Sequence, residues 1–254
     1  MKNKKLASAL HFFGGEKGGV GKSVVCKTVI QLYLDRQIPV VLYDTDRSNP
    51  DVIRCYRSEV TSKVAVLSEG ERYEDSANEI YNTAILNRVI VNLPAQVLNP
   101  LKNWILDNEL FEVAAEDGVQ LYHWFTSDGG YDSLHLAKNC LKTFQSQMPM
   151  IFIRNHGKTD DWSGFEDDSE LLELLQQYQV PVIDFPKLPG AAAKNRMDRD
   201  SLTFGQVRQN PDFSSIDKQR VRKFLREAYF AFDSLGYFSA PHLAEHLGGK
   251  VIAQ

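Results

Sequence analysis

The sequence predicts an α/β fold, a three-layer sandwich in which a mostly parallel central sheet carries helices on both faces. Six short apolar runs, typical of buried strands, alternate with stretches of helical periodicity, which is the pattern of strands joined by crossover helices. The 254 residues are 43% hydrophobic and 24% charged, an ordinary composition for a globular chain of one-domain size. Since no repeat or Pro/Gly-rich linker divides the chain, we expect a single domain over residues 1–254.

The strand-like runs are residues 9–13, 40–43, 89–93, 119–125, 150–154 and 180–185. The first helix is predicted over residues 23–36, because its apolar side chains recur at spacings that share one helix face. Further helices are predicted over residues 99–110, 134–145, 169–178 and 215–235.

A glycine-rich loop joins the first run to the first helix, with the sequence Gly14-Gly15-Glu16-Lys17-Gly18-Gly19-Val20-Gly21-Lys22-Ser23. Glycine lets successive backbone N–H groups turn inward and form an anion-binding nest, and the following helix directs its N-terminal dipole to the same point. Lys22 is suited to neutralise outer phosphates, and the Ser23 hydroxyl to ligate magnesium. The sequence therefore predicts a nucleoside triphosphate site formed by Gly15, Glu16, Lys17, Gly18, Gly19, Val20, Gly21, Lys22, Ser23 and Val24.

The strict phosphate-loop pattern G-x-x-x-x-G-K-[ST] requires a first glycine where this chain has Glu16. The stretch from Lys17 to Ser23 instead fits K-G-G-x-G-K-[ST], which resembles the deviant Walker A loop of the ParA/MinD family of dimerising ATPases, P-loop NTPases of the SIMIBI class. This resemblance implies ATP and Mg2+ as cofactors. It also implies that Lys17 reaches the phosphates of a partner subunit, so that ATP forms part of a homodimer interface. The alternative is a glycine-rich turn that binds no ligand.

Two carboxylates, Asp44 and Asp46, follow the second strand-like run. In a parallel sheet this position lies beside the loop, at the carboxyl ends of the strands. The resemblance implies that Asp46 orients the attacking water and approaches the magnesium shell, with Asp44 supporting the strand end. Lys17, Lys22, Asp46 and Asp44 form the expected catalytic set. The structural alternative is that the carboxylates cap the next turn.

The third run ends at Asn92, where the resemblance implies a Walker B aspartate that holds a magnesium-bound water. An amide accepts a hydrogen bond from that water but brings no negative charge, so we expect slow ATP hydrolysis. The expected metal-site residues are Ser23, Asp46 and Asn92. Two later segments resemble base-binding elements of the family, a strand that ends in Asn155 and a loop that contains Pro186.

The net charge of −4 is unevenly distributed. Residues 187–226 contain ten Lys or Arg and four Asp, and the spacing of Lys218, Arg222 and Arg226 places these three cations on one helix face. The functional interpretation is a non-specific DNA-binding patch, as the resemblance to ParA proteins implies. The structural alternative is a solvated helix face.

The chain is expected to be cytoplasmic, and nucleoid-associated if it binds DNA. No apolar run reaches the roughly 20 residues that a membrane span needs. Lys2, Lys4 and Lys5 precede an apolar stretch that resembles a signal peptide, but this stretch is short and runs directly into the loop. Residues 248–254 do not form a basic amphipathic helix, so we expect no stable membrane anchor.

Neither the cysteines nor a histidine-containing pattern near residue 242 is assigned a chemical role. The cysteines Cys26, Cys55 and Cys140 lie far apart and are interpreted as buried free thiols. The sequence His242-Leu243-Ala244-Glu245-His246 matches a metalloprotease pattern, but it leaves almost no sequence downstream for a third ligand.

The predicted function is an ATP-hydrolysing dimerisation switch that positions or segregates plasmid DNA or another cargo, together with a cargo adaptor or an ATPase-stimulating protein. A TraL-like role in conjugal plasmid transfer is a close variant. One alternative is a nucleotide-gated binding module with little hydrolysis, which Asn92 makes reasonable. A phosphotransferase with a P-loop is another.

Overall fold

The computed structural model of the chain describes residues 8–67 and 74–238. Three features that the sequence suggested lie outside the described residues: the basic positions Lys2, Lys4 and Lys5, the His242–His246 pattern, and the tail 248–254.

Seven parallel strands form one central sheet in the order β3-β2-β4-β1-β5-β6-β7. All of their carboxyl ends therefore meet at one edge. The strands are β1 (Ala9–Gly14), β2 (Val41–Asp44), β3 (Thr61–Val64), β4 (Arg88–Asn92), β5 (Gln120–Ser127), β6 (Met150–Asn155) and β7 (Val182–Phe185). The six predicted strands are confirmed with small shifts in their ends, and the sheet is parallel throughout its described strands.

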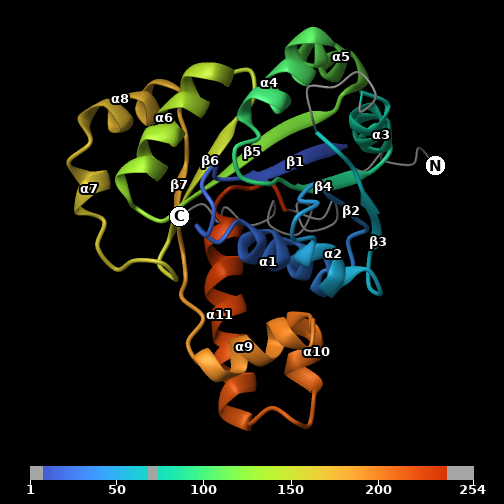
Figure 1. The fold of residues 1–254 in the computed structure, drawn as a ribbon, viewed down its shortest axis with the longest axis vertical. Helices are drawn as coiled ribbons and strands as arrows, with labels where there is room; N and C mark the ends of the chain where they lie inside the picture. The colour runs from blue at the N-terminus through green and yellow to red at the C-terminus, as the bar shows by residue number, and fades with distance from the viewer. Residues whose placement is uncertain (1–7, 68–73, 239–254) are drawn as a thin grey trace, which may run out of the picture.

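Helices cover both faces of this sheet (Figure 1). One face carries α1 (Lys22–Asp35), α2 (Asp51–Tyr56), α9 (Ala191–Arg199), α10 (Phe204–Gln209) and α11 (Ser215–Asp233), which share one hydrophobic cluster. The other face carries α3 (Glu74–Ala84), α4 (Leu98–Asp107), α5 (Leu110–Asp117), α6 (Tyr131–Phe144), α7 (Ser163–Glu166) and α8 (Ser169–Gln177), which pack in two further clusters. The three-layer α/β prediction is confirmed.

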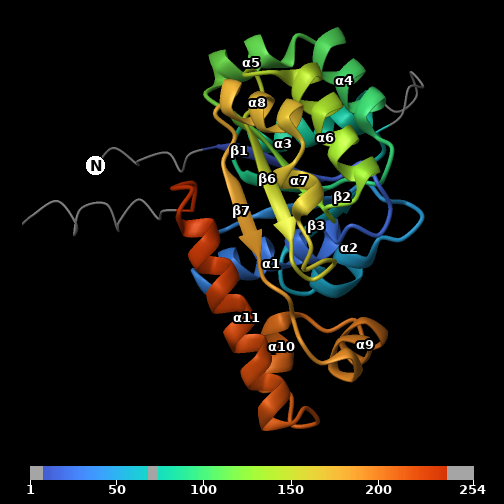
Figure 2. The ribbon, with the colours of Figure 1, turned by 90° about the vertical axis from the view of Figure 1, so that its left-hand side faces the viewer.

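The predicted helix over residues 99–110 is confirmed as α4, which ends at Asp107, and α5 follows it as a separate helix that was not predicted. The chain leaves the helical path at Asn108, and Glu109 has the left-handed φ of 47° that separates the two helices. The elements that the sequence did not predict are β3, α2, α3, α5, α7, α9 and α10. Of these, α9 and α10 form a lobe with the N-terminal half of α11. This lobe projects beyond the carboxyl ends of β6 and β7 (Figure 2).

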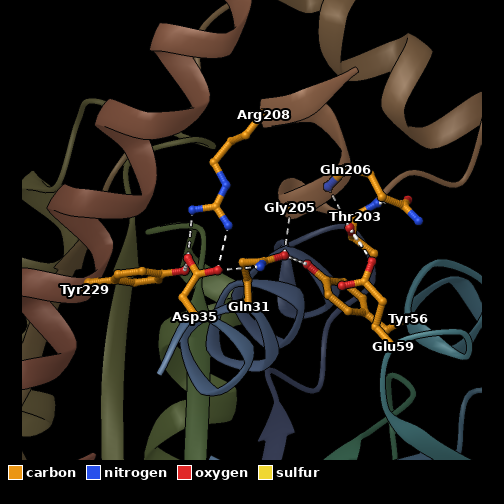
Figure 3. Close-up of polar contacts among 9 residues, drawn as sticks. All are labelled: Gln31, Asp35, Tyr56, Glu59, Thr203, Gly205, Gln206, Arg208 and Tyr229. Carbon is orange, nitrogen blue, oxygen red and sulfur yellow. Dashed lines mark hydrogen bonds and ion pairs between the residues drawn. The ribbon is translucent and has the colours of Figure 1, made fainter. Parts of the chain in front are cut away.

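A polar network ties α1 to the lobe (Figure 3). Asp35, the last residue of α1, accepts hydrogen bonds from both terminal nitrogens of Arg208 at 2.8 and 2.5 Å, and from the Tyr229 hydroxyl at 2.9 Å. One turn earlier, the buried Gln31 accepts a hydrogen bond of 2.9 Å from the backbone N–H of Gly205. The helix that begins at the glycine-rich loop is therefore attached at its far end to α10 and α11.

The structure also bears on the three cysteines and on membrane-spanning helices. Cys26, Cys55 and Cys140 are buried and form no disulfide, as predicted. Across the two described ranges, no helix has the length and apolar character that crossing a bilayer requires.

Candidate functional site

The glycine-rich loop lies at the carboxyl edge of the sheet, between the end of β1 and the start of α1. Gly21 immediately precedes α1 with a left-handed φ of 98°, and a Cβ there would lie 2.3 Å from Nδ2 of Asn155. At Gly15, a Cβ would lie 2.5 Å from the carbonyl oxygen of Thr126. Both positions therefore require glycine. Among the described residues, no side chain caps the N-terminus of α1, which leaves its first N–H groups available to bind an anion.

Lys22 is the first residue of α1, and its side chain is 8% exposed. Its ammonium donates a hydrogen bond of 3.1 Å to the backbone carbonyl of Lys17, so the side chain folds back over the loop. Burial lowers the pKa of Lys22, and the nearby carboxylates of Asp46 and Glu16 oppose this shift. A phosphate in the loop would supply the anionic partner that a buried ammonium needs. Ser23, the next residue, is half-buried at the same helix end.

Lys17 forms an ion pair of 3.0 Å with Asp128, which follows β5. The two side chains are 35% and 22% exposed, so solvent screens the pair. Asp128 also accepts a hydrogen bond from the N–H of Gly130 at 3.1 Å. In this structure Lys17 is therefore held by its own chain.

Asp44 is fully buried, and its carboxylate is occupied by protein donors. Oδ1 accepts from the Asp46 N–H at 3.2 Å and from Nδ2 of Asn92 at 3.0 Å, while Oδ2 accepts from the Ile53 N–H at 3.1 Å. Burial raises the pKa of Asp44. This side chain orders the β2 end and the first turn of α2, as the capping alternative describes.

Asp46 is half-buried and shapes the loop that follows β2. Its Oδ1 accepts hydrogen bonds from the Ser48 N–H at 3.1 Å, the Ser48 hydroxyl at 2.5 Å and the Asn49 N–H at 3.2 Å. The charge of Asp46 opposes the fall in the pKa of Lys22 that burial causes.

Asn92 ends β4, between Asp44 of β2 and Phe13 of β1. Its side chain is 1% exposed, and its Oδ1 has no hydrogen-bond partner among the described residues. An unpartnered buried acceptor at this edge would suit a water of a magnesium shell, and the Ser23 hydroxyl at the start of α1 would be a ligand for the same ion. Bound Mg2+ would supply positive charge to the phosphates. The acceptor that this chain offers is neutral, because it is an amide oxygen, and the amide nitrogen is oriented by its hydrogen bond to Asp44.

The two predicted base-binding residues, Asn155 and Pro186, lie beside the loop in a pocket of about 250 Å³. Asn155 braces the loop, since Nδ2 donates to the Val20 carbonyl at 2.8 Å and Oδ1 accepts from the Gly157 N–H at 2.9 Å. Gly21, Val24, Phe185 and Leu188 provide further walls of the pocket. Lys158 and Lys194 also line it, and no sequence motif pointed to these two lysines.

The three cations of the predicted DNA patch lie on α11, remote in sequence from the loop. Lys218 is half-buried, and Arg222 and Arg226 are exposed. Within the described part of the chain, none of the three forms an ion pair. Their neighbours Arg220 and Lys223 pair with Asp217 at 3.1 Å and Glu227 at 3.7 Å.

Solved structures described as a plasmid partition protein, a cell division protein complex and a ParA family ATPase share this fold. A plasmid partition protein from Borrelia burgdorferi bound to AMPPNP aligns with a TM-score of 0.53 and 12% identity, over 91% of this chain and 100% of that chain. The MinC:MinD cell division complex from Aquifex aeolicus aligns with a TM-score of 0.51 and 13% identity, over 92% and 98% of the two chains. A ParA family ATPase from Chlorobium tepidum aligns with a TM-score of 0.51 and 13% identity, over 86% and 98%.

Sequence similarity to known proteins covers less of the chain than structural similarity does. No family model matches the chain. Protein MobD from Acidithiobacillus ferrooxidans is 33% identical over 73 residues, which span 29% of this chain and about a third (32%) of MobD. The likeness in structure, by contrast, extends over most of the chain, and it agrees with the resemblance found in the loop sequence. The chain therefore has the fold of the ParA/MinD ATPases.

Proposed function

We propose that this chain is an ATP-binding, ATP-hydrolysing switch that dimerises through the nucleotide and positions or segregates DNA or another cargo. The observation that carries the proposal is the glycine-rich loop with Lys22 folded over it at the uncapped start of α1. The fold is consistent with this function, since the Borrelia protein of the same fold is described as bound to AMPPNP.

In the proposed site, residues Gly15–Val24 surround the phosphates, while Asn155 and Pro186 border the base. Lys22 stabilises charge that develops on the outer phosphates, and Ser23 and Asn92 serve the magnesium shell. Asp46 orients the attacking water, and Asp44 acts through Asn92 and the start of α2. These groups position reactants and stabilise charge, which is most of what phosphoryl transfer requires from a protein.

The proposed dimer gives Lys17 a second partner. In the described chain its ammonium pairs with Asp128, a contact that is partly exposed and therefore weak. Exchange of this carboxylate for the phosphates of a partner subunit replaces one negative charge by several. Nucleotide would thereby favour the dimer, and its loss would favour the monomer.

The proposed DNA contact uses Lys218, Arg222 and Arg226 on α11, whose charges are not consumed by ion pairs within the described residues. Replacement of all three by glutamate should abolish retention of DNA at low salt, because phosphate contacts supply most of non-specific affinity. A control with the same change in net charge replaces Lys63, Lys102 and Lys142 by glutamate. Because Lys63 and Lys142 form exposed ion pairs with Glu79 and Glu170, circular dichroism is used to check that both variants are folded. If the native chain is not retained on DNA at low salt, this contact does not exist.

Asn92 supports a second candidate function, a nucleotide-gated binding module with little hydrolysis. The free acceptor at the end of β4 is neutral, so less charge holds the magnesium shell than a carboxylate would provide. Such a module would dimerise with ATP and release it largely unchanged, with partner binding as its output.

Phosphate release from ATP separates these functions, measured with and without DNA, and with Lys22→Ala as the control. Slow release with no added phosphoacceptor, lost in Lys22→Ala, supports the ATPase switch and excludes an obligate phosphotransferase. ATP binding without phosphate release supports the gated module. Absence of ATP binding contradicts both.

A further inference from the structure

Glu16 places an acidic side chain inside a loop built to bind anions. It is 5% exposed, and its carboxylate points away from the loop toward α4. There, Oε2 accepts a hydrogen bond of 3.0 Å from the N–H of Leu98, the first residue of α4. Val97, at the N-cap position, offers no side-chain cap, so a residue of the glycine-rich loop performs this role for α4.

A second hydrogen bond joins the same two segments. The backbone carbonyl of Glu16 accepts from the N–H of Gln96 at 3.0 Å. Glu16 and Gln96 both have left-handed backbone angles, with φ of 50° and 58°. Such angles are costly for residues other than glycine, and they persist where the surrounding structure enforces them. The loop and the start of α4 are therefore fixed to each other by their main chains as well as by the Glu16 carboxylate.

When the loop binds a nucleotide, two opposing electrostatic effects act on the Glu16 carboxylate. The N-terminus of α4 favours a negative charge on Glu16, because unpaired N–H groups and the helix dipole are positive there. Phosphates in the adjacent loop disfavour that charge, because like charges at short range repel when they are shielded from water. The Lys22 ammonium, which now attracts the Glu16 carboxylate, would be neutralised by the phosphates. Burial already raises the pKa of Glu16.

We propose that Glu16 is a positioning residue that couples phosphate occupancy of the loop to the first turn of α4. Bound triphosphate weakens the cap that Glu16 provides, so the turn that begins at Leu98 opens more often. One surface pocket of about 600 Å³ is lined by Glu16, Lys17, Gln96 and Asn99. Opening of the first turn of α4 would therefore alter the surface beside Lys17. The inference rests on the nucleotide site proposed above.

Hydrogen exchange by mass spectrometry on the full chain, with and without AMPPNP, tests this coupling. In the native chain, AMPPNP should raise amide exchange several-fold over residues 97–101. The start of α8 provides an internal control, because Asp168 caps it through the Leu171 N–H at 3.0 Å and it does not belong to the glycine-rich loop. Exchange at that helix end should not change.

Two variants separate the charge of Glu16 from its hydrogen bond. Glu16→Gln keeps an acceptor for the Leu98 N–H but removes the repulsion, so AMPPNP should bind about three- to tenfold more tightly, and exchange over 97–101 should no longer respond. Glu16→Gly removes the cap, so these amides should exchange fast with or without AMPPNP, provided that circular dichroism shows a folded chain.

The result that overturns the coupling is AMPPNP binding to the native chain without a change over 97–101, or equal AMPPNP affinity of the native and Glu16→Gln chains. Failure of the native chain to bind AMPPNP in calorimetry is a different result. It removes the proposed nucleotide site itself, and the coupling with it.

Discussion

The amide of Asn92 and the carboxylate of Asp44 are joined by a hydrogen bond of 3.0 Å at the carboxyl edge of the sheet. A Walker B aspartate at this position would place a second negative charge against the buried Asp44. The amide avoids that repulsion and leaves Oδ1 as a neutral acceptor. The sequence alone revealed the departure at Asn92, whereas the partnership with Asp44 required the register of β2 and β4.

Replacing this amide tests whether the pair is electrostatically matched. Asn92→Asp should lower the free energy of unfolding by about 2 kcal/mol at pH 7, because two buried carboxylates then share one site. It should also make AMPPNP affinity depend more steeply on Mg2+. The exchange variant, Asp44→Asn with Asn92→Asp, restores one charge and one amide and should recover most of the stability. Urea unfolding measures the change in unfolding free energy, and calorimetry measures how AMPPNP affinity depends on Mg2+. Equal stability of the native and Asn92→Asp chains would contradict the matched-pair interpretation.

Other residue-scale features could not be predicted from sequence. Lys17 and Lys22 belong to a local motif, so their spacing identified them. Asp128 and the cap formed by Glu16 depend on contacts between segments more than 80 positions apart in the chain. No local pattern encodes such a contact.

At the scale of elements, the sequence predicted the described strands except β3, together with the helices α1, α4, α6, α8 and α11, but it missed α3 although that helix is amphipathic. Buried strands such as β1 and β4 are continuous apolar runs and were found. Strand β3 has the sequence Thr-Ser-Lys-Val and lies largely exposed at the sheet edge, so it shows no apolar run. The short helix α10 is defined by a capping box, in which Thr203 and Gln206 exchange hydrogen bonds, rather than by a long apolar face.

The contact of α1 with α10 and α11 gives a prediction at this scale. Asp35→Ala should lower the free energy of unfolding by about 2 kcal/mol, because Arg208 and the Tyr229 hydroxyl both lose their acceptor in a partly buried network. Asp233→Ala is the matched control. It removes a more exposed ion pair with Arg36 and should cost less than about 1 kcal/mol. Urea unfolding compares the two, and equal losses would show that the Asp35 network does not hold the lobe.

At the scale of the whole molecule, the fold of the ParA/MinD ATPases is reached with 12–13% identity to its structural neighbours. The alternation of apolar runs and amphipathic helices was enough to predict the layers. The packing inside them was not predictable, because polar side chains also occupy the core. His11 is 1% exposed and accepts a hydrogen bond from the Trp124 indole at 3.1 Å through Nδ1. His123 is equally buried, and neither of its ring nitrogens has a hydrogen-bond partner among the described residues.

These two histidines predict a loss of stability in mild acid. Burial lowers the pKa of His11 to about 3 and that of His123 to about 4. Because both folded-state values lie below the ordinary value near 6.5, their contribution is complete above pH 6.5 and is lost as the pH falls toward the folded values. Between pH 6.5 and pH 5, each should cost about 2 kcal/mol of unfolding free energy. Urea unfolding at pH 6.5 and at pH 5 measures this loss of unfolding free energy. In His123→Leu the loss between the two pH values should be smaller by the contribution of His123. An identical pH dependence in the native and variant chains would contradict this assignment.

In the proposed switch, nucleotide bound at the glycine-rich loop assembles the dimer through Lys17. Sedimentation velocity of the native chain and of Lys17→Ala, each saturated with AMPPNP and Mg2+ as judged by calorimetry, tests it most directly. We expect the native chain to sediment as a dimer only with AMPPNP, and Lys17→Ala to bind AMPPNP yet remain a monomer. A native chain that is saturated with AMPPNP and still monomeric would contradict the claim, as would a Lys17→Ala dimer of unchanged strength.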